Sequence, residues 1–282
     1  MQCKARAKIN WSLNTVGKRE DGYHLLDMVM QSVELHDTIT LDAADTLSLR
    51  VDGMVHVPST EDNLVLRAAH ALRDYTGVPK GADIHLHKRI PVGAGMGGGS
   101  ADAAAVLKGL NELWQLGLSQ QELLTIGLKL GADIPFCLTN GLCRAQGIGE
   151  ILTPHPALRP YHLVIIQPCR ALSTKQVFTA LHESENVRRP DTEGVLTALA
   201  EGNFPLLARS MGNTLQEVSI PLRPAIRDAI TSLREHGARA AQMTGSGSAV
   251  FGVFSTAAAA RTAYQSLQRK YRVCHLTYTT DA

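Results

Sequence analysis

Residues 91–105, PVGAGMGGGSADAAA, constrain the fold of this chain more than any other segment. Five glycines, at positions 93, 95, 97, 98 and 99, precede Ser100 and an alanine-rich stretch. Glycine lets backbone N–H groups approach an anion without a Cβ in the way. A helix that begins after such a loop directs unpaired N–H groups and its positive dipole end at the same place. Since so many glycines cost much entropy in a simple turn, the segment predicts a phosphate-binding loop.

The residues on both sides of the loop support this interpretation. Residues 82–90 (ADIHLHKRI) alternate between polar and apolar side chains, which indicates a strand. After the loop, Ser100 is a candidate N-cap and Gly117 a candidate end for a helix. Apolar residues in this stretch recur at spacings of three and four: Ala103, Val106, Leu107, Leu110, Leu113 and Trp114. The pattern therefore predicts a strand, a glycine-rich loop and a helix with one buried face.

Two general phosphate motifs fit this loop poorly. A Walker A loop needs Lys and then Ser or Thr after its last glycine, whereas Gly99 is followed by Ser and Ala. Gly93, Gly95 and Gly98 match the dinucleotide pattern G-x-G-x-x-G. That pattern also needs a following strand with an acidic residue, and residues 111–130 predict further helix instead.

The loop instead resembles the P-x-x-x-G-[LM]-G-[SG]-[GS]-S-[AS] motif of the GHMP kinases, which include galactokinase, homoserine kinase, mevalonate kinase and phosphomevalonate kinase. Residues 4–13 (KARAKINWSL) are similar to the A-K-[IV]-N motif of that family, and residues 243–250 (MTGSGSAV) to its second glycine-rich loop. The resemblance runs from Ala5 to about Phe254. Three motifs in the right order are far more specific than one alone.

Shorter segments resemble one branch of the family, which phosphorylates the 2-hydroxyl of a methylerythritol that carries cytidine diphosphate, in the non-mevalonate isoprenoid route. They are residues 19–24 (REDGYH), 131–136 (GADIPF), 139–150 (TNGLCRAQGIGE) and 213–215 (NTL). The resemblance implies an ATP-dependent kinase that uses Mg²⁺, and a small-molecule substrate with a cytidine diphosphate group. No carboxylate matches the Mg²⁺-binding Glu of some relatives, so we expect ATP to hold the ion and predict no protein metal ligands.

Two other functions stay open. The chain could be another GHMP-type kinase, of the homoserine or mevalonate class, but those substrates have no nucleobase for Tyr23 and His24 to contact. It could also be a non-catalytic nucleotide-binding protein on the same fold. A degenerate site of that kind would usually have lost Lys8 or Asp133, and both are present.

Composition limits the partners of the chain. With 282 residues, 44% hydrophobic and 19% charged, it has the composition of a soluble globular protein. A net charge of +2 does not indicate a nucleic-acid partner. The sequence has no run of 18 apolar residues, so it predicts no membrane segment. Five cysteines without a C-x-x-C spacing suggest reduced thiols, so we expect a cytoplasmic protein, as a monomer or weak homodimer.

Residues 153–160 (TPHPALRP), with three prolines, mark a candidate boundary. The fold class is α+β, and the resemblance implies the two-domain GHMP kinase fold. We expect an ATP-binding, S5-like N-terminal domain at residues 1–153 and a ferredoxin-like C-terminal domain at residues 160–282. Periodicity predicts strands at 38–41, 47–51, 83–90, 161–167, 249–254 and 273–278, and helices at 64–75, 101–116, 120–130, 175–182, 194–201, 206–211, 224–236 and 256–271.

Lys8 and Asp133 are the candidate catalytic residues. Lys4, Arg6 and Lys8 alternate with small apolar residues and share one strand face. On the residues alone, Lys8 fits a surface lysine, and Asp133 fits a helix cap or a buried ion pair. The resemblance assigns Lys8 to stabilising charge on the substrate hydroxyl or the transferred phosphate, and Asp133 to the catalytic carboxylate.

The resemblance also assigns the binding residues. Asn10, two positions after Lys8, faces the same side, and Tyr23 and His24 follow the turn signal Asp-Gly. Tyr23 and His24 would stack on and hydrogen-bond a cytosine, and Thr174 would help to hold the nucleotide end. ATP is assigned to Pro91, Val92, Gly93, Ala94, Gly95, Met96, Gly97, Gly98, Gly99, Ser100 and Ala101. Asp102 is left without a role, because a carboxylate in the first helical turn opposes phosphate binding.

Overall fold

The computed structural model describes residues 1–53, 57–182 and 187–281, and its chain forms two compact units. Unit 1 comprises Met1–Ala7, Leu35–Val92 and Gly97–Asn140, and unit 2 comprises Lys8–Glu34, Gly93–Met96 and Gly141–Ala282. Two long strands, β1 (Gln2–Lys18) and β2 (His24–Ala44), therefore contribute residues to both units. The expected sequence domains, 1–153 and 160–282, remain a proposal about how the chain divides.

The sheet of unit 1 combines antiparallel and parallel pairs. The second half of β2 pairs antiparallel with β4 (Gly81–Lys88), and β3 (Leu47–Gly53) pairs parallel with β4. A parallel pair needs a long crossover connection, and α1 (Leu64–Thr76) lies in it. Alternation along β4 buries Ala82, Ile84 and Leu86, as the sequence pattern predicts.

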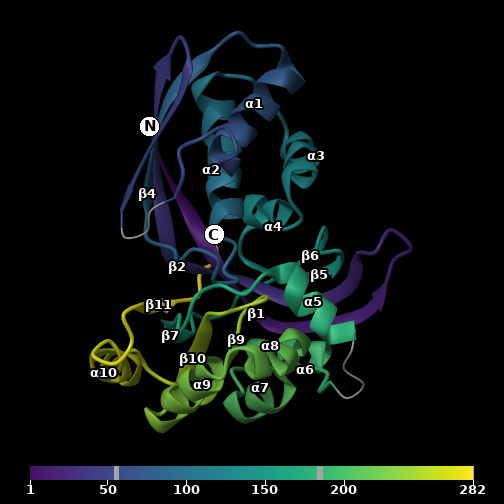
Figure 1. Cartoon of the computed structure of the whole chain (residues 1–282), viewed down its shortest axis with the longest axis vertical. Helices are drawn as coiled ribbons and strands as arrows, with labels where there is room; N and C mark the ends of the chain where they lie inside the picture. The colour runs from purple at the N-terminus through teal and green to yellow at the C-terminus, as the bar shows by residue number, and fades with distance from the viewer. Residues whose placement is uncertain (54–56, 183–186, 282) are drawn as a thin grey trace. The chain divides into compact units, whose positions relative to one another are not determined.

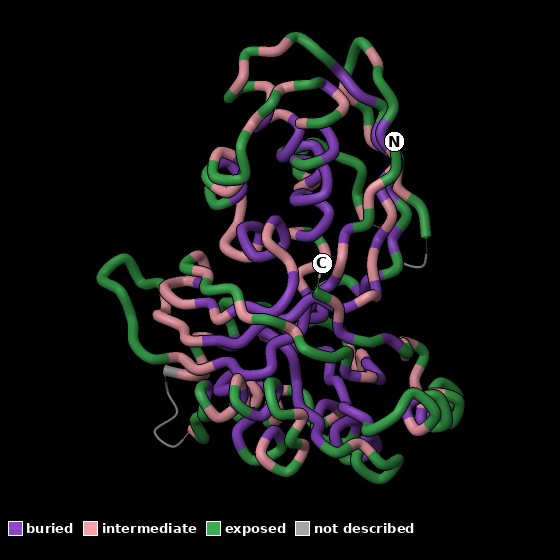
Figure 2. The backbone as a smooth tube through the Cα atoms, turned by 180° about the vertical axis from the view of Figure 1, so that it is seen from behind, coloured by how far each residue is buried: buried purple, intermediate pink, exposed green. Residues whose placement is uncertain are grey.

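The central helix of unit 1 follows the glycine-rich loop. This helix, α2 (Gly98–Leu113), contacts α1, α3 (Gln120–Leu130) and α4 (Ile134–Thr139), and Figure 2 shows it buried along most of its length. The prediction that Ser100 caps this helix is wrong, because the N-cap is Gly97 and Ser100 lies inside the first turn. Gly97 has a φ of 68°, a conformation that glycine adopts without strain, so the helix begins directly from the loop.

Unit 2 contains a four-stranded antiparallel sheet with the order β11-β7-β10-β9. Its strands are β7 (His162–Ile166), β9 (Ala240–Met243), β10 (Val250–Phe254) and β11 (Cys274–Tyr278). The helix α9 (Ala225–Glu235) contacts β9 and β10, and α10 (Ala257–Leu267) contacts β7, β10 and β11 (Figure 1). The central βαββαβ path is the expected ferredoxin-like arrangement.

The remaining strands of unit 2 belong to the seven-stranded sheet that also contains β3 and β4. The first half of β2 pairs with β5 (Leu142–Gly147), β5 pairs with β6 (Ile151–His155), and β1 pairs parallel with β8 (Gly212–Asn213). β5 and β6 were not predicted from the sequence. β6 begins two residues before the proline-rich boundary at residues 153–160 and extends into it. Pro154 is compatible with a strand that lies at the edge of a sheet. The remaining helices are α5 (Thr174–His182), α6 (Thr192–Glu201), α7 (Phe204–Ser210) and α8 (Thr214–Leu222).

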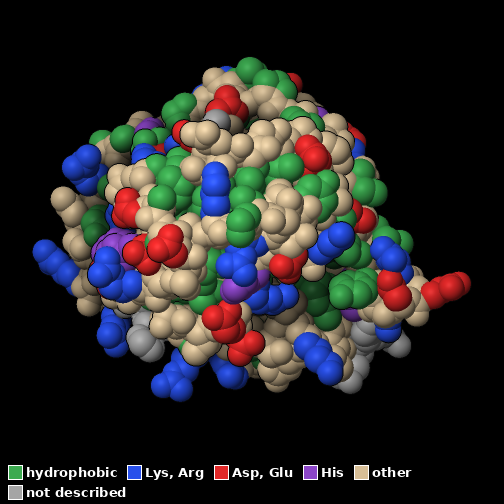
Figure 3. Space-filling model, turned by 90° about the horizontal axis from the view of Figure 1, so that it is seen from above, with side chains coloured by type: hydrophobic (Ala, Val, Ile, Leu, Met, Phe, Trp, Pro, Cys, Tyr) green, Lys and Arg blue, Asp and Glu red, His purple; other side chains and the backbone are tan. Residues whose placement is uncertain are grey.

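Charge is dispersed on the face of the molecule in Figure 3. Lys and Arg side chains there alternate with Asp and Glu side chains and with apolar ones. On the described part of this face, no continuous basic surface of the kind that binds nucleic-acid backbones is visible. Within the residues that the structure describes, no helix is long and apolar enough to cross a membrane.

Trp11 of β1 is the largest side chain that is fully buried in unit 2. Its ring meets Tyr161 and Phe251 edge to face, at centroid distances of 5.4 and 5.7 Å. Its Nε1 donates a hydrogen bond of 2.8 Å to Oε1 of Gln31, so its polar atom is satisfied. Trp11 thus links β1 to β2, to β10 and to Tyr161, the residue directly before β7.

Replacing Trp11 by Ala should lower the free energy of unfolding by about 3–5 kcal/mol, because it leaves a cavity and an unpaired Gln31 amide oxygen. Urea denaturation measures the effect. Val16→Ala on the same strand is the control, since Val16 is 53% exposed and should change stability by about 0.5 kcal/mol or less. Equal losses in the two variants would contradict the packing role of Trp11.

Candidate active site

The Lys8 side chain is buried although it is charged. Lys8 lies on β1 and is 4% exposed, and its Nζ donates a hydrogen bond of 2.8 Å to Oδ1 of Asn10. The two side chains share a strand face because they are two residues apart. The backbone N–H of Lys8 donates to the carbonyl of Met96 at 3.0 Å. β1 therefore contacts the first glycine-rich loop at Met96 through the Lys8 backbone, and the interpretation of Lys8 as a surface lysine is wrong.

Asn10 connects Lys8 to the second glycine-rich loop, residues 244–248. Besides Lys8, its Oδ1 accepts hydrogen bonds from the Thr244 hydroxyl at 3.2 Å and from the Gly245 N–H at 3.0 Å. Its backbone N–H donates to the Thr244 Oγ1 at 3.0 Å. Asn10 is fully buried, so in this structure its amide organises the cluster. The expectation that Asn10 also contacts a substrate stays a proposal.

Close backbone contact between the two loops explains two of the glycines. Gly95 has a φ of 75°, and a Cβ there would lie 2.3 Å from the Thr244 carbonyl oxygen. Gly245 has a φ of 55°, and its Cβ would lie 2.6 Å from the Gly95 carbonyl oxygen. Any other residue at either position would both strain the backbone and separate the loops. These glycines therefore serve loop packing, a reason that the sequence pattern did not reveal.

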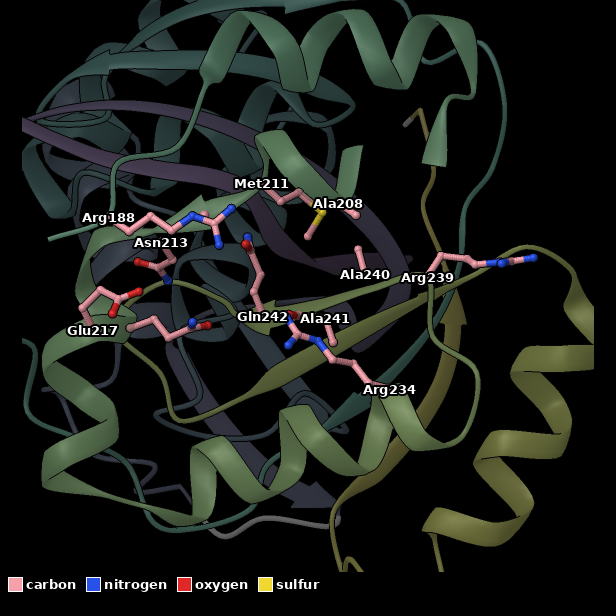
Figure 4. Close-up of a pocket in the computed structure, with 12 residues that line it drawn as sticks. Arg188, Ala208, Met211, Asn213, Glu217, Arg234, Arg239, Ala240, Ala241 and Gln242 are labelled. Atoms are coloured by element: carbon pink, nitrogen blue, oxygen red, sulfur yellow. The ribbon is translucent and has the colours of Figure 1, made fainter. Parts of the chain in front are cut away.

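Two further amide side chains, those of Asn213 on β8 and Gln242 on β9, stabilise this arrangement of β1 and the second glycine-rich loop. Nδ2 of Asn213 donates to the carbonyls of Met243 and Gly245 at 3.0 and 2.8 Å. Nε2 of Gln242 donates to the carbonyls of Asn10 and Trp11 at 2.9 and 3.1 Å. Both line a cavity of about 200 Å³ whose rim includes arginines, and Figure 4 shows Arg239 pointing away from it. The sequence analysis gave Gln242 no role, because a single Gln in a short strand carries no local signal.

Tyr23 and His24 lie at the start of β2 and have different surroundings. Gly22, with a φ of 90°, forms the preceding turn, and the Tyr23 N–H donates to Oδ1 of Asp21 at 3.2 Å. The Tyr23 side chain is 60% exposed, as the stacking hypothesis requires. The His24 ring stacks on Phe178 of α5, with centroids 4.4 Å apart and an interplanar angle of 22°. Phe178 is thus an aromatic neighbour that the sequence analysis did not identify.

Thr174 is the first residue of α5, and its hydroxyl contacts the second glycine-rich loop. The Oγ1 of Thr174 lies 3.1 Å from the Oγ of Ser246, and either can donate. Thr174 is exposed and Ser246 is half-buried. Thr174 and Ser246 are therefore available to a ligand of unit 2, and the assignment of Thr174 to the substrate stays a proposal.

The start of α2, in unit 1, has the backbone geometry of an anion site. No side chain caps the first turn, so its N–H groups are not satisfied by a capping residue. Gly98 and Gly99 keep the turn close to its neighbours: a Cβ would lie 3.0 Å from Cγ2 of Ile90 at Gly98 and 3.4 Å from Cδ1 of Leu64 at Gly99. An uncapped helix start with this composition fits the phosphates of a nucleotide.

Asp133, also in unit 1, occupies the N-cap position of α4 without capping it. Its side chain makes no hydrogen bond to the first turn of the helix, and the residue is half-buried. The alternative that Asp133 is a helix cap is therefore not supported by its side-chain geometry. Among the residues that the structure describes, no group of three or more His, Cys, Asp or Glu side chains is placed to hold a metal ion.

Comparisons with known proteins agree with this geometry. The family patterns "GHMP kinases N terminal domain" and "GHMP kinases C terminal" match residues 63–141 and 195–273. A 4-diphosphocytidyl-2-C-methyl-D-erythritol kinase of Alkaliphilus metalliredigens is 43% identical over 277 residues, which cover 98% of this chain and 95% of the relative. The enzyme of that name from Clostridium tetani is 37% identical, over 99% of this chain and 100% of its own.

Solved structures show the same relationship. The crystal structure of a 4-(cytidine 5'-diphospho)-2C-methyl-D-erythritol kinase is 33% identical, has a TM-score of 0.86 and matches 100% of both chains. The crystal structure of L. major mevalonate kinase in complex with R-mevalonate has a TM-score of 0.76 at 15% identity, covers 100% of this chain and 96% of its own, and shows the fold alone. The chain has the expected α+β GHMP kinase fold, and it belongs to the GHMP kinase family, among the 4-diphosphocytidyl-2-C-methyl-D-erythritol kinases.

Proposed function

We propose that this kinase transfers a phosphoryl group from ATP to the 2-hydroxyl of 4-diphosphocytidyl-2-C-methyl-D-erythritol, with Lys8 and Asp133 as catalytic residues. Among the structural observations, the proposal rests most on the buried amine of Lys8, which donates to the same Asn10 oxygen that accepts from the Gly245 N–H of the second glycine-rich loop. A buried cation beside backbone loops of this kind suits phosphoryl transfer, which depends on positioning and electrostatic stabilisation. The near full-length similarity to enzymes of that name supports the choice of substrate.

In the proposed reaction, ATP supplies the phosphoryl group and Mg²⁺ shields its charge. Asp133 accepts the proton of the 2-hydroxyl, and the Lys8 ammonium stabilises negative charge on the reacting oxygens. The substrate oxygen forms a bond to phosphorus as the bond to the leaving phosphate oxygen breaks, which yields ADP. We assign the ATP phosphates to residues 91–101 and expect ATP itself to hold most of the Mg²⁺ coordination.

The cytidine end of the substrate is assigned to the start of β2 and to α5. The exposed ring of Tyr23 offers a stacking surface. We assign the hydrogen bond to a base edge to His24. Phe178 fixes the plane of the His24 ring by stacking on it. Thr174 and Ser246 add hydroxyl groups for the diphosphate. A specific aromatic and histidine pair of this kind favours a nucleobase-bearing substrate over homoserine or mevalonate.

Several narrower expectations belong to the same proposal. We infer that the enzyme acts in the cytoplasm as a monomer or weak homodimer, and that nucleic acids and membranes are not its partners. The dispersed charge in Figure 3 supports the exclusion of nucleic acids. Size-exclusion chromatography with light scattering tests the oligomeric state directly.

The substrate assignment is tested by measuring ATP consumption with three acceptors side by side. We expect turnover with 4-diphosphocytidyl-2-C-methyl-D-erythritol, and rates at least about 10²-fold lower with homoserine and with mevalonate, which lack the cytidine. Preference for either of the other acceptors would contradict the proposal. No turnover with any of the three would instead favour a non-catalytic nucleotide-binding protein.

Replacing Asp133 by Asn should lower kcat by about 10²-fold or more, because the amide keeps the shape but cannot accept the proton. Steady-state kinetics give kcat, and calorimetry should show little change in ADP affinity. Asp74→Asn, which removes an exposed carboxylate from α1, is the control and should keep the wild-type kcat. A near-normal kcat in Asp133→Asn would remove Asp133 from the mechanism.

Replacing Tyr23 by Ala should raise KM for the cytidyl substrate roughly 5- to 150-fold, because base stacking contributes about 1–3 kcal/mol. KM for ATP should barely move. CDP should also protect the wild type against thermal unfolding more than it protects the variant. Tyr75→Ala is the matched control, since Tyr75 is a 47% exposed tyrosine of α1 and should leave both KM values unchanged. Loss of ATP affinity in Tyr23→Ala would contradict the cytidine assignment.

A further inference from the structure

Three charged side chains are buried together in unit 1. Lys88, at the end of β4, donates hydrogen bonds to Oδ2 of Asp37 on β2 and, at 2.7 Å, to Oδ2 of Asp102 on α2. The side chains of Lys88, Asp37 and Asp102 are 3%, 0% and 4% exposed. Burial of ions on this scale is costly unless each charge is compensated. The question is therefore which of these three side chains carry a charge in the folded protein.

Asp37 has the partners that an ionised carboxylate needs. Its Oδ2 accepts from Lys88, and its Oδ1 accepts from the backbone N–H groups of Arg89 and Ile90, the latter at 2.8 Å. Three donors, one of them an ammonium, stabilise the anion. Asp37 and Lys88 thus form a complete ion pair without help from Asp102.

Asp102 has fewer partners. Its Oδ2 accepts from Lys88, but its Oδ1 is buried and has no hydrogen-bond partner. Leaving a carboxylate oxygen bare in the protein interior is strongly unfavourable, and a neutral acid is much less so. With Lys88 and Asp37 both charged, an ionised Asp102 would leave a net charge of about −1 on the cluster, whereas a protonated Asp102 leaves it neutral.

The cluster lies under the phosphate-binding turn. Asp102 is the fifth residue of α2, directly after residues 97–101. A Cβ on Gly98 would lie 3.5 Å from the Nζ of Lys88, so the amine is immediately beneath the first residue of the helix. A negative charge here would repel a bound phosphate and would offset the positive field of the helix N-terminus that attracts it. This position makes the protonation of Asp102 relevant to nucleotide binding.

The groups around Asp102 also favour its neutral form. Burial raises its pKa to about 8, the ion pair with Lys88 opposes this rise, and the Asp37 carboxylate adds to it. Lys88 comes from β4 and Asp37 from β2. α1, α3 and α4 also contact α2, and their buried residues are small or apolar, such as Ala69, Ile126 and Phe136, with Cys137 as the one titratable side chain among them.

We propose that Asp102 is a positioning residue that carries a proton while phosphate is bound at the start of α2, so that the buried cluster beneath the loop is uncharged overall. The proton resides on Oδ1, because Oδ2 already accepts from Lys88. The inference rests on the proposed assignment of this turn to the nucleotide phosphates. It accounts for a carboxylic acid at a place where a carboxylate would repel the ligand.

The proposal fixes the sign of a pH effect. A bound phosphate disfavours ionisation of Asp102 further, so nucleotide binds the protonated protein more tightly. Above pH 8 the free protein loses this proton and must regain it on binding. Affinity should therefore fall as pH rises, by up to about 30-fold between pH 7 and pH 9.5 if the complex keeps the proton throughout.

Calorimetry of ADP binding at constant Mg²⁺ between pH 7 and pH 9.5 tests this inference. In the wild type we expect the fall in affinity and, in buffers of different ionisation enthalpy, net proton uptake near pH 8.5. Asp102→Asn places a neutral amide where the protonated acid was, so its pH profile should be flat and its proton uptake absent. Asp83→Asn, which removes an exposed carboxylate from β4, should behave as the wild type does.

Each outcome of these measurements either supports or overturns the proposal for Asp102. A flat wild-type profile without proton uptake overturns the proposal, as does a wild-type slope in Asp102→Asn, since the proton would then belong to another group. If Asp102→Asn does not fold, infrared spectra of the wild type serve as the test instead. A protonated-carboxyl band that is present at pH 7 and persists at pH 9 only with ADP supports the proposal. The absence of this band overturns the proposal. No ADP binding at any pH would overturn the assignment of this turn, whereas binding without pH dependence would overturn the Asp102 inference alone.

Discussion

The side-chain oxygen of Asn10 accepts hydrogen bonds from the Lys8 ammonium, the Thr244 hydroxyl and the Gly245 N–H. These three groups come from one strand and from a loop more than 230 residues later in the chain. A single amide thereby binds a buried cation and fixes the second glycine-rich loop against β1. A buried ammonium needs partners, and the Asn10 amide is one of those that Lys8 has.

The glycines near Asn10 show that one residue type can have two physical functions in the same loop. Gly95 and Gly245 are required where two backbones approach closely, as their missing Cβ atoms show. Gly97 is required where α2 begins at a positive φ without a side-chain cap. Only the second function offers N–H groups to an anion. The glycine count of the loop therefore overstates how many of its residues exist for phosphate binding.

Much of the fold could be predicted from the sequence because its signals are local. The strand before the loop, the amphipathic α2 and three strands of the C-terminal sheet, β7, β10 and β11, follow from periodicity over 16 residues or fewer each, whereas the short β9 was not predicted. The two glycine-rich loops and the start of β1 could be found for the same reason. The helix start was misplaced because Ser100 is a good cap by composition, whereas Gly97 begins the helix by backbone conformation alone.

The rest of the site depends on contacts that no local pattern contains. Phe178 is one apolar residue of an amphipathic helix until the fold stacks it on His24. Lys88 and Asp37 are 51 residues apart in sequence. Alternation along each strand places both on a buried face, but no local pattern shows that they pair. Their pairing leaves Asp102 without a counter-charge of its own, which is why we propose that Asp102 is protonated beneath the start of α2. An anion site at a helix start needs exposed N–H groups, and the buried side chains beneath it must carry no net negative charge. Such a charge would cancel the favourable field of the helix.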